Sequence, residues 1–346
     1  MRPPESDWSK SITSPKIPNA SRHVLSGSGN ICAVIDQAFV LGAGLGTRLR
    51  PLTDDLPKPL VPIFGKPLIT FALDHLATAG VRSFCVNTHH LPSHFETLFA
   101  GGAYHQLPVR LVHEPVLLET GGGIKNAQSW LGTDPFLVYS GDVLTDLPLG
   151  PLIEHHFRSR NDVTLALRQT GLACNVAFHD GRVLDIGNRH GHPGNYDYAN
   201  VSIWSSAVFD RIPTGRKISF IPILAEWIGA GGKIGGVVLN EGRWFNLGSP
   251  NEYLAVHRVI EEKRWQPAYV QTSDWPQRIA SDAIIDPTAQ VKGYSAIGAG
   301  CHVGAGAIIE NSILWAGAQI ASRSCLKRCI VRSYRTAQGA LTDAVI

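Results

Sequence analysis

The chain has 346 residues, of which 44% are hydrophobic and 17% are charged. This composition excludes disorder over most of the chain and is sufficient for one large or two modest domains with a buried core. The formal net charge is only +3, which is too balanced to indicate binding to nucleic acid or to a membrane surface through bulk charge. Any site for an anion must therefore be local.

The cysteines and the apolar runs bear on the cellular location. The six cysteines have no paired Cys-x-x-Cys spacing, which argues against a disulfide framework and against a zinc site. The sequence contains neither an apolar signal segment nor a run of about 18 apolar residues. We therefore expect a cytoplasmic protein with no membrane partner and no nucleic-acid partner.

Three regions follow one another along the chain. Residues 1–32 are rich in Ser, Pro and Asn, which predicts a disordered leader without visible chemistry. From residue 33 to about 265, short apolar strands alternate with helices, a pattern typical of a mostly parallel sheet, and after about 162 α+β material joins the same sheet. The predicted strands are 33–41, 83–87, 109–112, 136–139, 163–167, 176–178, 183–186 and 201–204, and the predicted helices are 67–79, 121–130, 220–228 and 251–262.

The third region, residues 280–335, has a period of six. Aliphatic side chains recur at Ile285, Val291, Ile297, Val303 and Ile309, with glycines between them. This hexapeptide spacing places one aliphatic side chain per short strand inside a parallel β-helix. The pattern blurs after Ile309, and the candidates to continue it are Ile313, Ile320, Leu326 and Ile330. We expect about three coils of a short left-handed β-helix, which serves more often as an oligomerisation or regulatory cap than as a second enzyme.

The strongest chemical signal is the run Leu-Gly-Ala-Gly-Leu-Gly-Thr-Arg-Leu-Arg-Pro-Leu-Thr at 41–53, directly after the first predicted strand. Glycines at alternate positions let backbone amides approach a phosphate chain, and a fixed cation neutralises the charge that develops on it. Arg48 and Lys58 are the cations that we expect to do so. A dinucleotide fingerprint needs glycine at Thr47, and a P-loop needs Gly-Lys-Ser/Thr before a helix, so both fit poorly. The alternative, a tight turn with surface charges, does not explain why the run continues so far.

Residues 42–67 resemble the signature of the nucleoside-diphosphate-sugar pyrophosphorylases, which are sugar-1-phosphate nucleotidyltransferases. The shared elements are Gly-x-Gly-Thr-Arg-Leu, Pro-Leu-Thr and Pro-Lys-Pro-Leu. The resemblance implies that residues 33–265 form a Rossmann-like α/β catalytic domain in which the glycine loop holds a nucleoside triphosphate. It also implies that Arg48 and Lys58 stabilise charge at the α-phosphate and on the leaving pyrophosphate. The loop residues expected at the nucleotide are Leu41, Gly42, Ala43, Gly44, Gly46 and Thr47.

A second segment, Glu-Pro-Val-Leu-Leu-Glu-Thr-Gly-Gly-Gly-Ile-Lys at 114–125, follows a predicted strand and opens a helix. Its glycines allow the backbone to approach a base, or a phosphate at a helix N-terminus. A plain loop at the start of a helix is the alternative. The segment looks like the base- and sugar-reading motif of the family, and the resemblance implies nucleotide contacts from Glu114, Thr120, Gly121 and Gly122.

A third segment, Phe-Leu-Val-Tyr-Ser-Gly-Asp-Val at 136–143, puts Asp142 just past the end of a buried strand, where open α/β sheets bind ligands. A carboxylate there suits Mg²⁺, although a turn or N-cap role is the alternative. The resemblance implies that Asp142 is a metal ligand. Asn246 stands where the family usually has a second aspartate, and because an amide oxygen adds no charge, this departure predicts a weaker metal site.

The sugar site is less clearly marked. The segment Asn-Val-Ser-Ile-Trp at 200–204 resembles the Asn-x-Gly-Ile-Tyr segment of the family, whose asparagine contacts sugar hydroxyls. The Glu-Lys-Pro segment that helps to hold the sugar phosphate in the family is missing, and Arg189 is the candidate to replace it. We therefore expect Asn200, Asp142 and Arg189 to contact the sugar phosphate.

The resemblance implies a Mg²⁺-dependent reaction in which a nucleoside triphosphate and a sugar 1-phosphate give a nucleotide sugar and pyrophosphate. The second and third motifs look most like the N-acetylmuramate-1-phosphate uridylyltransferases, which favours UTP. A β-helix tail is common among mannose-1-phosphate guanylyltransferases, so GTP is the alternative. A hypothesis from another class is a non-catalytic regulatory subunit that binds nucleotide sugars, although Arg48, Lys58 and Asp142 are intact. A homo-oligomer formed through the β-helix is a further expectation.

Overall fold

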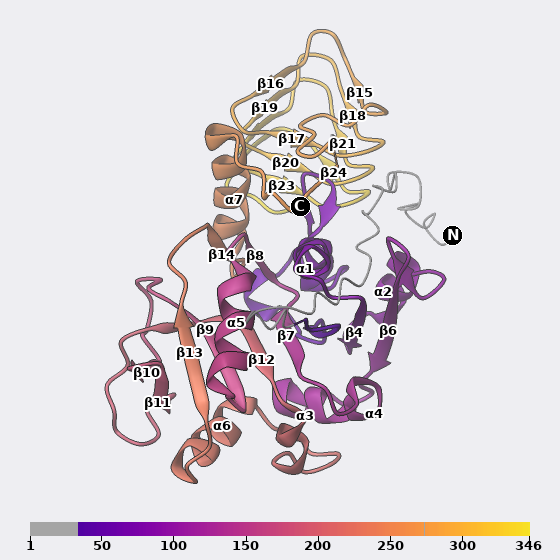
Figure 1. The fold of residues 1–346 in the computed structure, drawn as a ribbon. Helices are drawn as coiled ribbons and strands as arrows, with labels where there is room; N and C mark the ends of the chain where they lie inside the picture. The colour runs from indigo at the N-terminus through magenta and orange to yellow at the C-terminus, as the bar shows by residue number, and fades with distance from the viewer. Residues whose placement is uncertain (1–33, 273) are drawn as a thin grey trace, which may run out of the picture.

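The computed structural model describes residues 34–272 and 274–346, so the expected leader at 1–32 lies outside the described residues. Figure 1 shows a large sheet covered by helices, with a stack of short strands at one end. The predicted α/β domain and the predicted parallel β-helix are both present. In the described part of the chain, no helix is long and apolar enough to cross a membrane.

The strands of the large sheet include all eight that were predicted. These are β1 (Gln37–Leu41), β4 (Ser83–Thr88), β6 (Leu107–His113), β7 (Phe136–Ser140), β9 (Val163–Arg168), β10 (Val176–His179), β11 (Arg182–Ile186) and β12 (Asp197–Trp204). Two further strands, β5 (Ala103–Tyr104) and β13 (Ile234–Val238), were not predicted. Two small pairs complete the domain: β2 (Pro62–Ile63) with β3 (Lys66–Pro67), and β8 (Val143–Thr145) with β14 (Trp244–Asn246).

The predicted helices also form. They are α1 (Leu68–Thr78), α3 (Glu119–Asn126) with the short α4 (Gln128–Leu131), α6 (Phe220–Gly229) and α7 (Pro250–Lys263). The sequence did not predict α2 (Pro92–Leu98) or α5 (Leu149–Ser159). Helix α7 is capped by Ser249, whose Oγ accepts the N–H of Glu252, while the carboxylate of Glu252 accepts the hydroxyl of Ser249 and the N–H of Gly248.

The strand order of the large sheet is β10-β11-β13-β9-β12-β7-β1-β4-β6-β5. β1 pairs in parallel with both β4 and β7, and β4 pairs in parallel with β6. β12 runs antiparallel to both of its neighbours, β7 and β9. Of the ten strands, only β5, β11 and β12 run against the common direction. The sheet is therefore mixed but mostly parallel, as expected.

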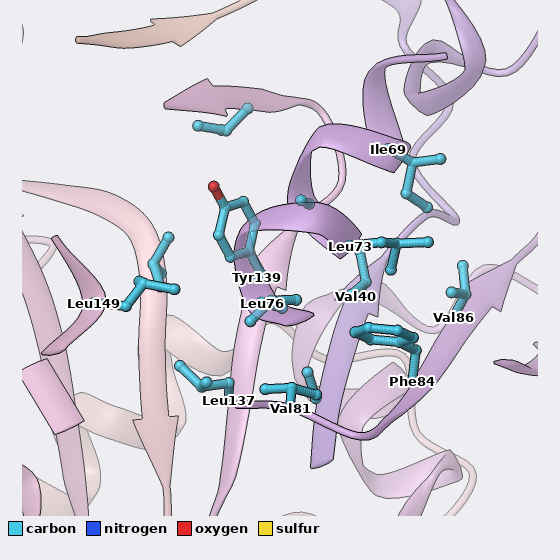
Figure 2. Packing of buried hydrophobic residues seen from close by; sticks show 14 of the residues in the cluster. Val40, Ile69, Leu73, Leu76, Val81, Phe84, Val86, Leu137, Tyr139 and Leu149 are labelled. Carbon is cyan, nitrogen blue, oxygen red and sulfur yellow. The ribbon is translucent and has the colours of Figure 1, made fainter. Parts of the chain in front are cut away.

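Alternation along β1 gives the sheet two buried faces. Ala38 and Val40 lie in one apolar cluster with residues of α1 and α5, whereas Phe39 lies in another with residues of α3, α4 and α6. Figure 2 shows Val40 in the first cluster, packed near Leu73 and Leu76 of α1. Because helices cover both faces, side chains in the central strands are buried whichever way they point. This explains why these strands are continuous apolar runs.

A buried polar contact ties the end of β7 to α1. Tyr139 is fully buried, and its hydroxyl lies 3.2 Å from Nδ1 of His75. Burial lowers the pKa of His75 to about 4, so this histidine is neutral at pH 7 and the contact is a hydrogen bond between uncharged groups. This hydrogen bond therefore fixes the carboxyl end of β7, the strand that leads to Asp142.

The β-helix consists of three stacks of parallel strands. One stack contains β15 (Ile284–Ile285), β18 (His302–Val303), β21 (Gln319–Ile320) and β24 (Thr336–Ala337). The second contains β16 (Gln290–Lys292), β19 (Ile308–Glu310), β22 (Cys325–Lys327) and β25 (Ala340–Thr342), and the third contains β17 (Ala296–Ile297), β20 (Ile313–Leu314) and β23 (Ile330–Val331). The strands make three full coils and part of a fourth, and parallel stacks of this kind are consistent with the expected left-handed form.

The interior of the β-helix follows the predicted period only as far as Ile309. Ile297, Val303 and Ile309 lie in its core, and so do Ile320 and Leu326. The prediction was wrong for Ile313 and Ile330, because Leu314 and Val331 take the interior positions instead.

The length of one corner explains this shift. Three residues, 293–295, separate β16 from β17, but only two residues, 311–312 and 328–329, separate the equivalent strands of the next coils. Asn311 and Arg328 have φ values of 52° and 51°, so these shorter corners turn through the left-handed region. The shorter corner reduces the interval between interior side chains from six residues to five, from Ile309 to Leu314. Ile313 and Ile330 pair in line with Ala296 on the outer face, where they share one apolar cluster with residues of the catalytic domain.

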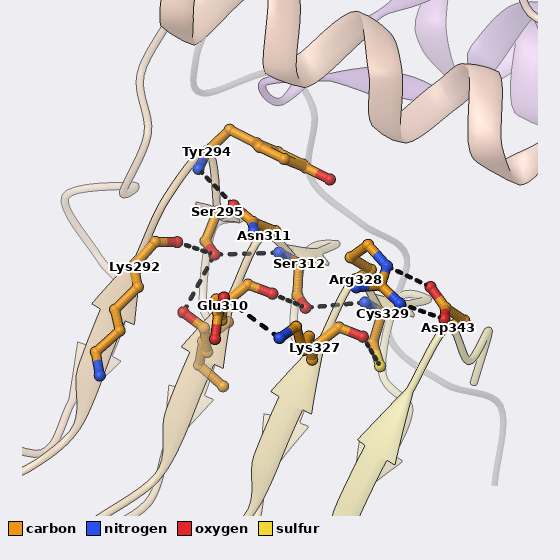
Figure 3. Close-up of polar contacts among 11 residues, drawn as sticks. Lys292, Tyr294, Ser295, Glu310, Asn311, Ser312, Lys327, Arg328, Cys329 and Asp343 are labelled. Carbon is orange, nitrogen blue, oxygen red and sulfur yellow. Dashed lines mark hydrogen bonds and ion pairs between the residues drawn. The ribbon is translucent and has the colours of Figure 1, made fainter.

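A buried hydrogen-bond ladder crosses the same corner. Ser312 N–H donates to Ser295 Oγ at 3.1 Å, and Cys329 N–H donates to Ser312 Oγ at 2.9 Å. Figure 3 shows these side chains stacked from coil to coil, and all three are fully buried. Each hydroxyl thus satisfies an amide that the tight corner leaves without a strand partner.

We predict that Ser312→Ala destabilises the protein. The change removes the acceptor of the Cys329 amide, and an unsatisfied buried donor costs about 1–3 kcal/mol. The measurement is the urea unfolding midpoint, which should fall relative to wild type. Ser322→Ala, at an exposed corner serine, is the matched control and should leave the midpoint unchanged. Equal midpoints for both variants would show that the ladder does not stabilise the corner.

Candidate functional site

The site lies at the carboxyl ends of β1, β4 and β7. The chain passes from β1 to β4 on one side and returns later to β7 on the other, which makes the end of β1 a topological switch point. A cavity of about 540 Å³, called here the switch-point pocket, opens at this place. Among the predicted site residues, its lining contains Leu41, Ala43, Gly44, Gly46, Thr47, Arg48, Lys58, Thr120 and Asp142.

The glycine loop is shaped by one residue in particular. Gly46 has a φ of +62°, and a Cβ built on it would lie 2.9 Å from Cβ of Lys58. Its carbonyl oxygen accepts the hydroxyl of Thr53 at 3.0 Å, and the 3₁₀ turn Thr47–Leu49 begins directly after it. Gly44 differs, because a Cβ there would meet no atom within 4 Å. Gly46 is thus required by the fold, whereas Gly44 faces open space in the pocket.

Glu114 has a different place from the one we expected. Its side chain is fully buried, and it is absent from the lining of the switch-point pocket. Its Oε1 accepts from Asn87 Nδ2 at 2.8 Å, and its Oε2 accepts the N–H of Leu118 at 2.9 Å. Asn87 Oδ1 in turn accepts the N–H of Gly42 at 2.8 Å. Glu114 and Asn87 therefore hold the start of the glycine loop in place through a chain of hydrogen bonds.

Asn87 also lines the pocket, although it belongs to none of the three motifs that predicted the site. It lies at the carboxyl end of β4, the edge at which open α/β sheets bind ligands, and this position was the signal that would have identified it. Other lining residues that were missed include Leu117, Glu119, Ser140, Ser219 and Gly248.

The glycines of α3 have a packing role in this structure. The N–H groups of Gly121 and Gly122 both donate to the carbonyl oxygen of Ile218, at 2.9 and 3.0 Å. A Cβ on Gly122 would lie only 2.3 Å from the carbonyl oxygen of Arg216. The amides that we expected near a ligand are thus used within the protein, while Thr120 lines the pocket and accepts the N–H of Phe220.

Lys58 and Asp142 line the pocket, and Asn246 lies beside Lys58 without lining the pocket itself. Lys58 Nζ lies 2.6 Å from Asp142 Oδ2 and 3.5 Å from Asn246 Oδ1. Pairing of β14 with β8 places Asn246 opposite Val143, directly beside Asp142. Both oxygens therefore converge on one cation, which is the donor set that Mg²⁺ takes from proteins when phosphates and water supply its remaining ligands.

The described residues contain no group of three or more His, Cys, Asp or Glu side chains that could hold a metal ion. A metal at Asp142 and Asn246 would therefore take its remaining ligands from substrate phosphates and water. Arg48 also lines the pocket, on the turn after Gly46, and a Cβ on Gly248 would lie 3.6 Å from its Cζ. The Arg48 guanidinium group thus lies within van der Waals distance of this position.

The two remaining sugar-site candidates lie at different distances from the pocket. Asn200 precedes Val201, which pairs with Tyr139, so it lies beside the end of β7 at a bulge in β12, with a φ of 63°. Arg189 lies in the loop after β11, separated from β7 by β13, β9 and β12, and its N–H donates to Asp185. Neither residue lines the switch-point pocket, and the structure does not bring Arg189 to it.

Known proteins resemble this chain in both sequence and fold. Residues 37–263 match the family model described as nucleotidyl transferase. A mannose-1-phosphate guanylyltransferase from Mycobacterium tuberculosis is 30% identical, over 84% of this chain and 83% of its own. An N-acetylmuramate alpha-1-phosphate uridylyltransferase from Caulobacter vibrioides is 33% identical, over 65% of this chain and 97% of its own.

A solved structure agrees with the fold. A putative glucose-1-phosphate thymidylyltransferase from Bacillus anthracis superimposes with a TM-score of 0.55 at 17% identity, over 62% of this chain and 90% of its own. The residues that match the family model make up more than half of the chain, and they include the glycine loop, Lys58, Asp142 and Asn246. The chain therefore belongs to the nucleotidyl transferase family.

Proposed function

We propose that this protein transfers a nucleotidyl group from a nucleoside triphosphate to a sugar 1-phosphate and releases pyrophosphate. The observation that carries the proposal is the meeting of the glycine loop, Arg48, Lys58 and Asp142 in one pocket at the switch point, with Asn246 Oδ1 lying 3.5 Å from Lys58 Nζ. A triphosphate needs backbone amides and positive charge at its phosphates, and the pocket offers both.

The reaction requires alignment and charge neutralisation rather than a covalent enzyme intermediate. An oxygen of the sugar phosphate attacks the α-phosphorus in line, and the bond from the α-phosphorus to the oxygen of the leaving pyrophosphate breaks. Lys58 has a side chain only 8% exposed, so its charge acts in a partly dehydrated site. Arg48 is exposed at the lining and is free to follow the phosphates. We assign charge neutralisation on the triphosphate to these two residues.

Mg²⁺ fits the same site. Asp142 and Asn246 are the residues that would hold it, and bound Mg²⁺ would neutralise phosphate charge. Asn200 remains our candidate for a sugar contact because it lies beside the end of β7. Arg189 carries less weight, since its loop starts at β11 on the far part of the sheet.

We propose UTP as the nucleotide. The support is the Leu-Glu-Thr-Gly-Gly-Gly-Ile and Gly-Asp-Val-Leu-Thr-Asp motifs, together with the 33% identity to the Caulobacter vibrioides uridylyltransferase. GTP with mannose 1-phosphate is the second candidate. It is favoured by the Mycobacterium tuberculosis guanylyltransferase, whose similarity covers 84% of this chain and so reaches beyond the catalytic domain.

The test is a substrate panel. Pyrophosphate release is measured with Mg²⁺ for UTP, GTP, dTTP, CTP and ATP, each crossed with the 1-phosphates of N-acetylmuramate, N-acetylglucosamine, glucose and mannose. We expect release with UTP and one of these sugars, and loss of release when a chelator removes Mg²⁺. Release only with GTP would replace the nucleotide assignment. If folded protein released no pyrophosphate with any substrate pair, this result would contradict the proposed reaction and support a regulatory subunit.

Removal of the charge of Arg48 or of Lys58 should lower turnover sharply while the protein stays folded. We predict that Arg48→Ala and Lys58→Ala each lower kcat by about two orders of magnitude, because a fixed charge at the phosphates is lost. Arg50→Ala is the matched control, since the Arg50 side chain is 60% exposed and pairs with Asp54. The control should keep near-normal kcat. If Arg48→Ala or Lys58→Ala also did so, the role of that residue would be refuted.

The two glycines of the loop should respond differently to alanine. Gly46→Ala forces a Cβ into the left-handed region against Lys58, so we expect a loss of about 1–2 kcal/mol in the free energy of unfolding. Gly44→Ala meets no protein atom, so the melting temperature should not change. We expect it instead to weaken binding of the triphosphate, measured by calorimetry. Unchanged binding by Gly44→Ala would show that the loop does not cradle the phosphates.

A further inference from the structure

The segment that follows the glycine loop touches the β-helix. Arg332, just after β23, has a side chain only 15% exposed, and its Nη1 donates to Pro51 O at 3.1 Å and to Asp55 Oδ2 at 2.6 Å. Its Nε donates to the carbonyl oxygen of Ile346 at 3.2 Å. Arg332 therefore joins the β-helix to both ends of the segment 51–55, which connects the two pocket cations along the chain.

The segment 51–55 also makes hydrogen bonds to the glycine loop and to His90 through Thr53. Thr53 Oγ1 donates to Gly46 O at 3.0 Å, and the carbonyl oxygen of Thr53 lies 3.1 Å from Nε2 of His90. Arg332 is thus linked to Gly46 through its hydrogen bonds to Pro51 and Asp55, the backbone of the segment 51–55, and the hydrogen bond from Thr53 to Gly46. Arg48 lies between Gly46 and Pro51 in the sequence.

Apolar packing follows the same route. Leu49, just before the segment, and Leu52, within it, are fully buried, and they share one cluster with Ile313, Trp315 and Ile330 of the β-helix. Ile313 and Ile330 lie on the outer face, in line with Ala296 of the preceding coil. The β-helix thus supports the segment through a buried apolar contact as well as through the guanidinium group.

We propose that Arg332 is a positioning residue for nucleotidyl transfer. Through Arg332, the β-helix fixes the segment 51–55 and thereby the position of the turn Thr47–Leu49, which carries Arg48 at the pocket. This proposal rests on the proposed function. In-line transfer depends on alignment, and a displacement of about 1 Å far from the chemistry can cost about a hundredfold in rate. A partly buried guanidinium that binds a carbonyl and a carboxylate together fixes a backbone segment more firmly than a flexible ammonium does.

Arg335 provides the matched control. Its Nη2 also donates to Asp55 Oδ2, at 2.8 Å, but its side chain is 49% exposed and it makes no bond to Pro51 among the described contacts. Replacing Arg335 removes one charge from Asp55 and leaves the bond from Arg332 to Pro51 intact. Comparison of the two arginines therefore separates positioning of the backbone from a general effect of charge on Asp55.

The kinetic experiment measures kcat, and KM for each substrate, for wild type and for Arg332→Ala, Arg332→Lys and Arg335→Ala. We expect Arg332→Ala to lower kcat about tenfold, with an unchanged KM for the sugar phosphate and an unchanged melting temperature. Arg332→Lys should recover part of kcat, and Arg335→Ala should change kcat less than twofold. A normal kcat for Arg332→Ala, or an equal loss for Arg335→Ala, would overturn the assignment.

A second readout does not depend on activity. Amide hydrogen exchange of the segment 49–55, without substrates, should be faster in Arg332→Ala and in Asp55→Asn than in wild type, while exchange in β1 and β7 is unchanged. Equal exchange in all three proteins would overturn the positioning role. If the wild type were inactive on every substrate pair, the proposed function would fail, and the exchange result would still decide whether Arg332 holds the segment.

Discussion

The ion pair between Lys58 and Asp142 is the interaction on which the site depends. It spans 2.6 Å and joins residues 84 positions apart in the sequence. A lysine whose side chain is only 8% exposed requires an opposite charge, because an unpaired ammonium at such a position loses most of its hydration without compensation. The pair therefore draws the loop after β1 to the end of β7, and this closes the floor of the pocket.

The remaining contacts around the pocket keep that floor in place. Asn87 links the N–H of Gly42 to Glu114, so the start of the glycine loop is tied to the ends of β4 and β6. Gly141 N–H donates to Leu41 O at 2.9 Å, and a Cβ there would lie 2.8 Å from the same oxygen. Glycine at this position thus lets β1 and β7 end side by side, which carries Asp142 to Lys58.

Local patterns were sufficient to predict most of the catalytic domain. The apolar strands and amphipathic helices were recognisable because each buries one continuous surface, and the glycine loop was recognisable because its residue types are chemically demanding. The buried role of Glu114 and the packing role of Gly121 and Gly122 were not predictable. These roles depend on contacts with Asn87 and Ile218, which lie 27 or more residues away, and no local pattern reports such partners. Arg189 failed to reach the pocket for the same reason, since strand order decides its position.

In the β-helix, the length of one corner decides which residues of the next strand a fixed period predicts correctly. The period of six predicted its interior correctly until the corner at 311–312, which is one residue shorter than the corner at 293–295. Ile313 and Ile330 lie on the outer face in line with Ala296, where they join Tyr253 and Leu254 of α7 and Leu49 and Leu52 in one cluster. Trp315 Nε1 also donates to Tyr253 Oη at 2.9 Å, which adds a buried hydrogen bond to this apolar contact. Because this one cluster contains residues of both units, the β-helix meets two requirements at once: its inner face closes its own coils, and its outer face packs in the same cluster as Leu49 and Leu52, which follow the glycine loop.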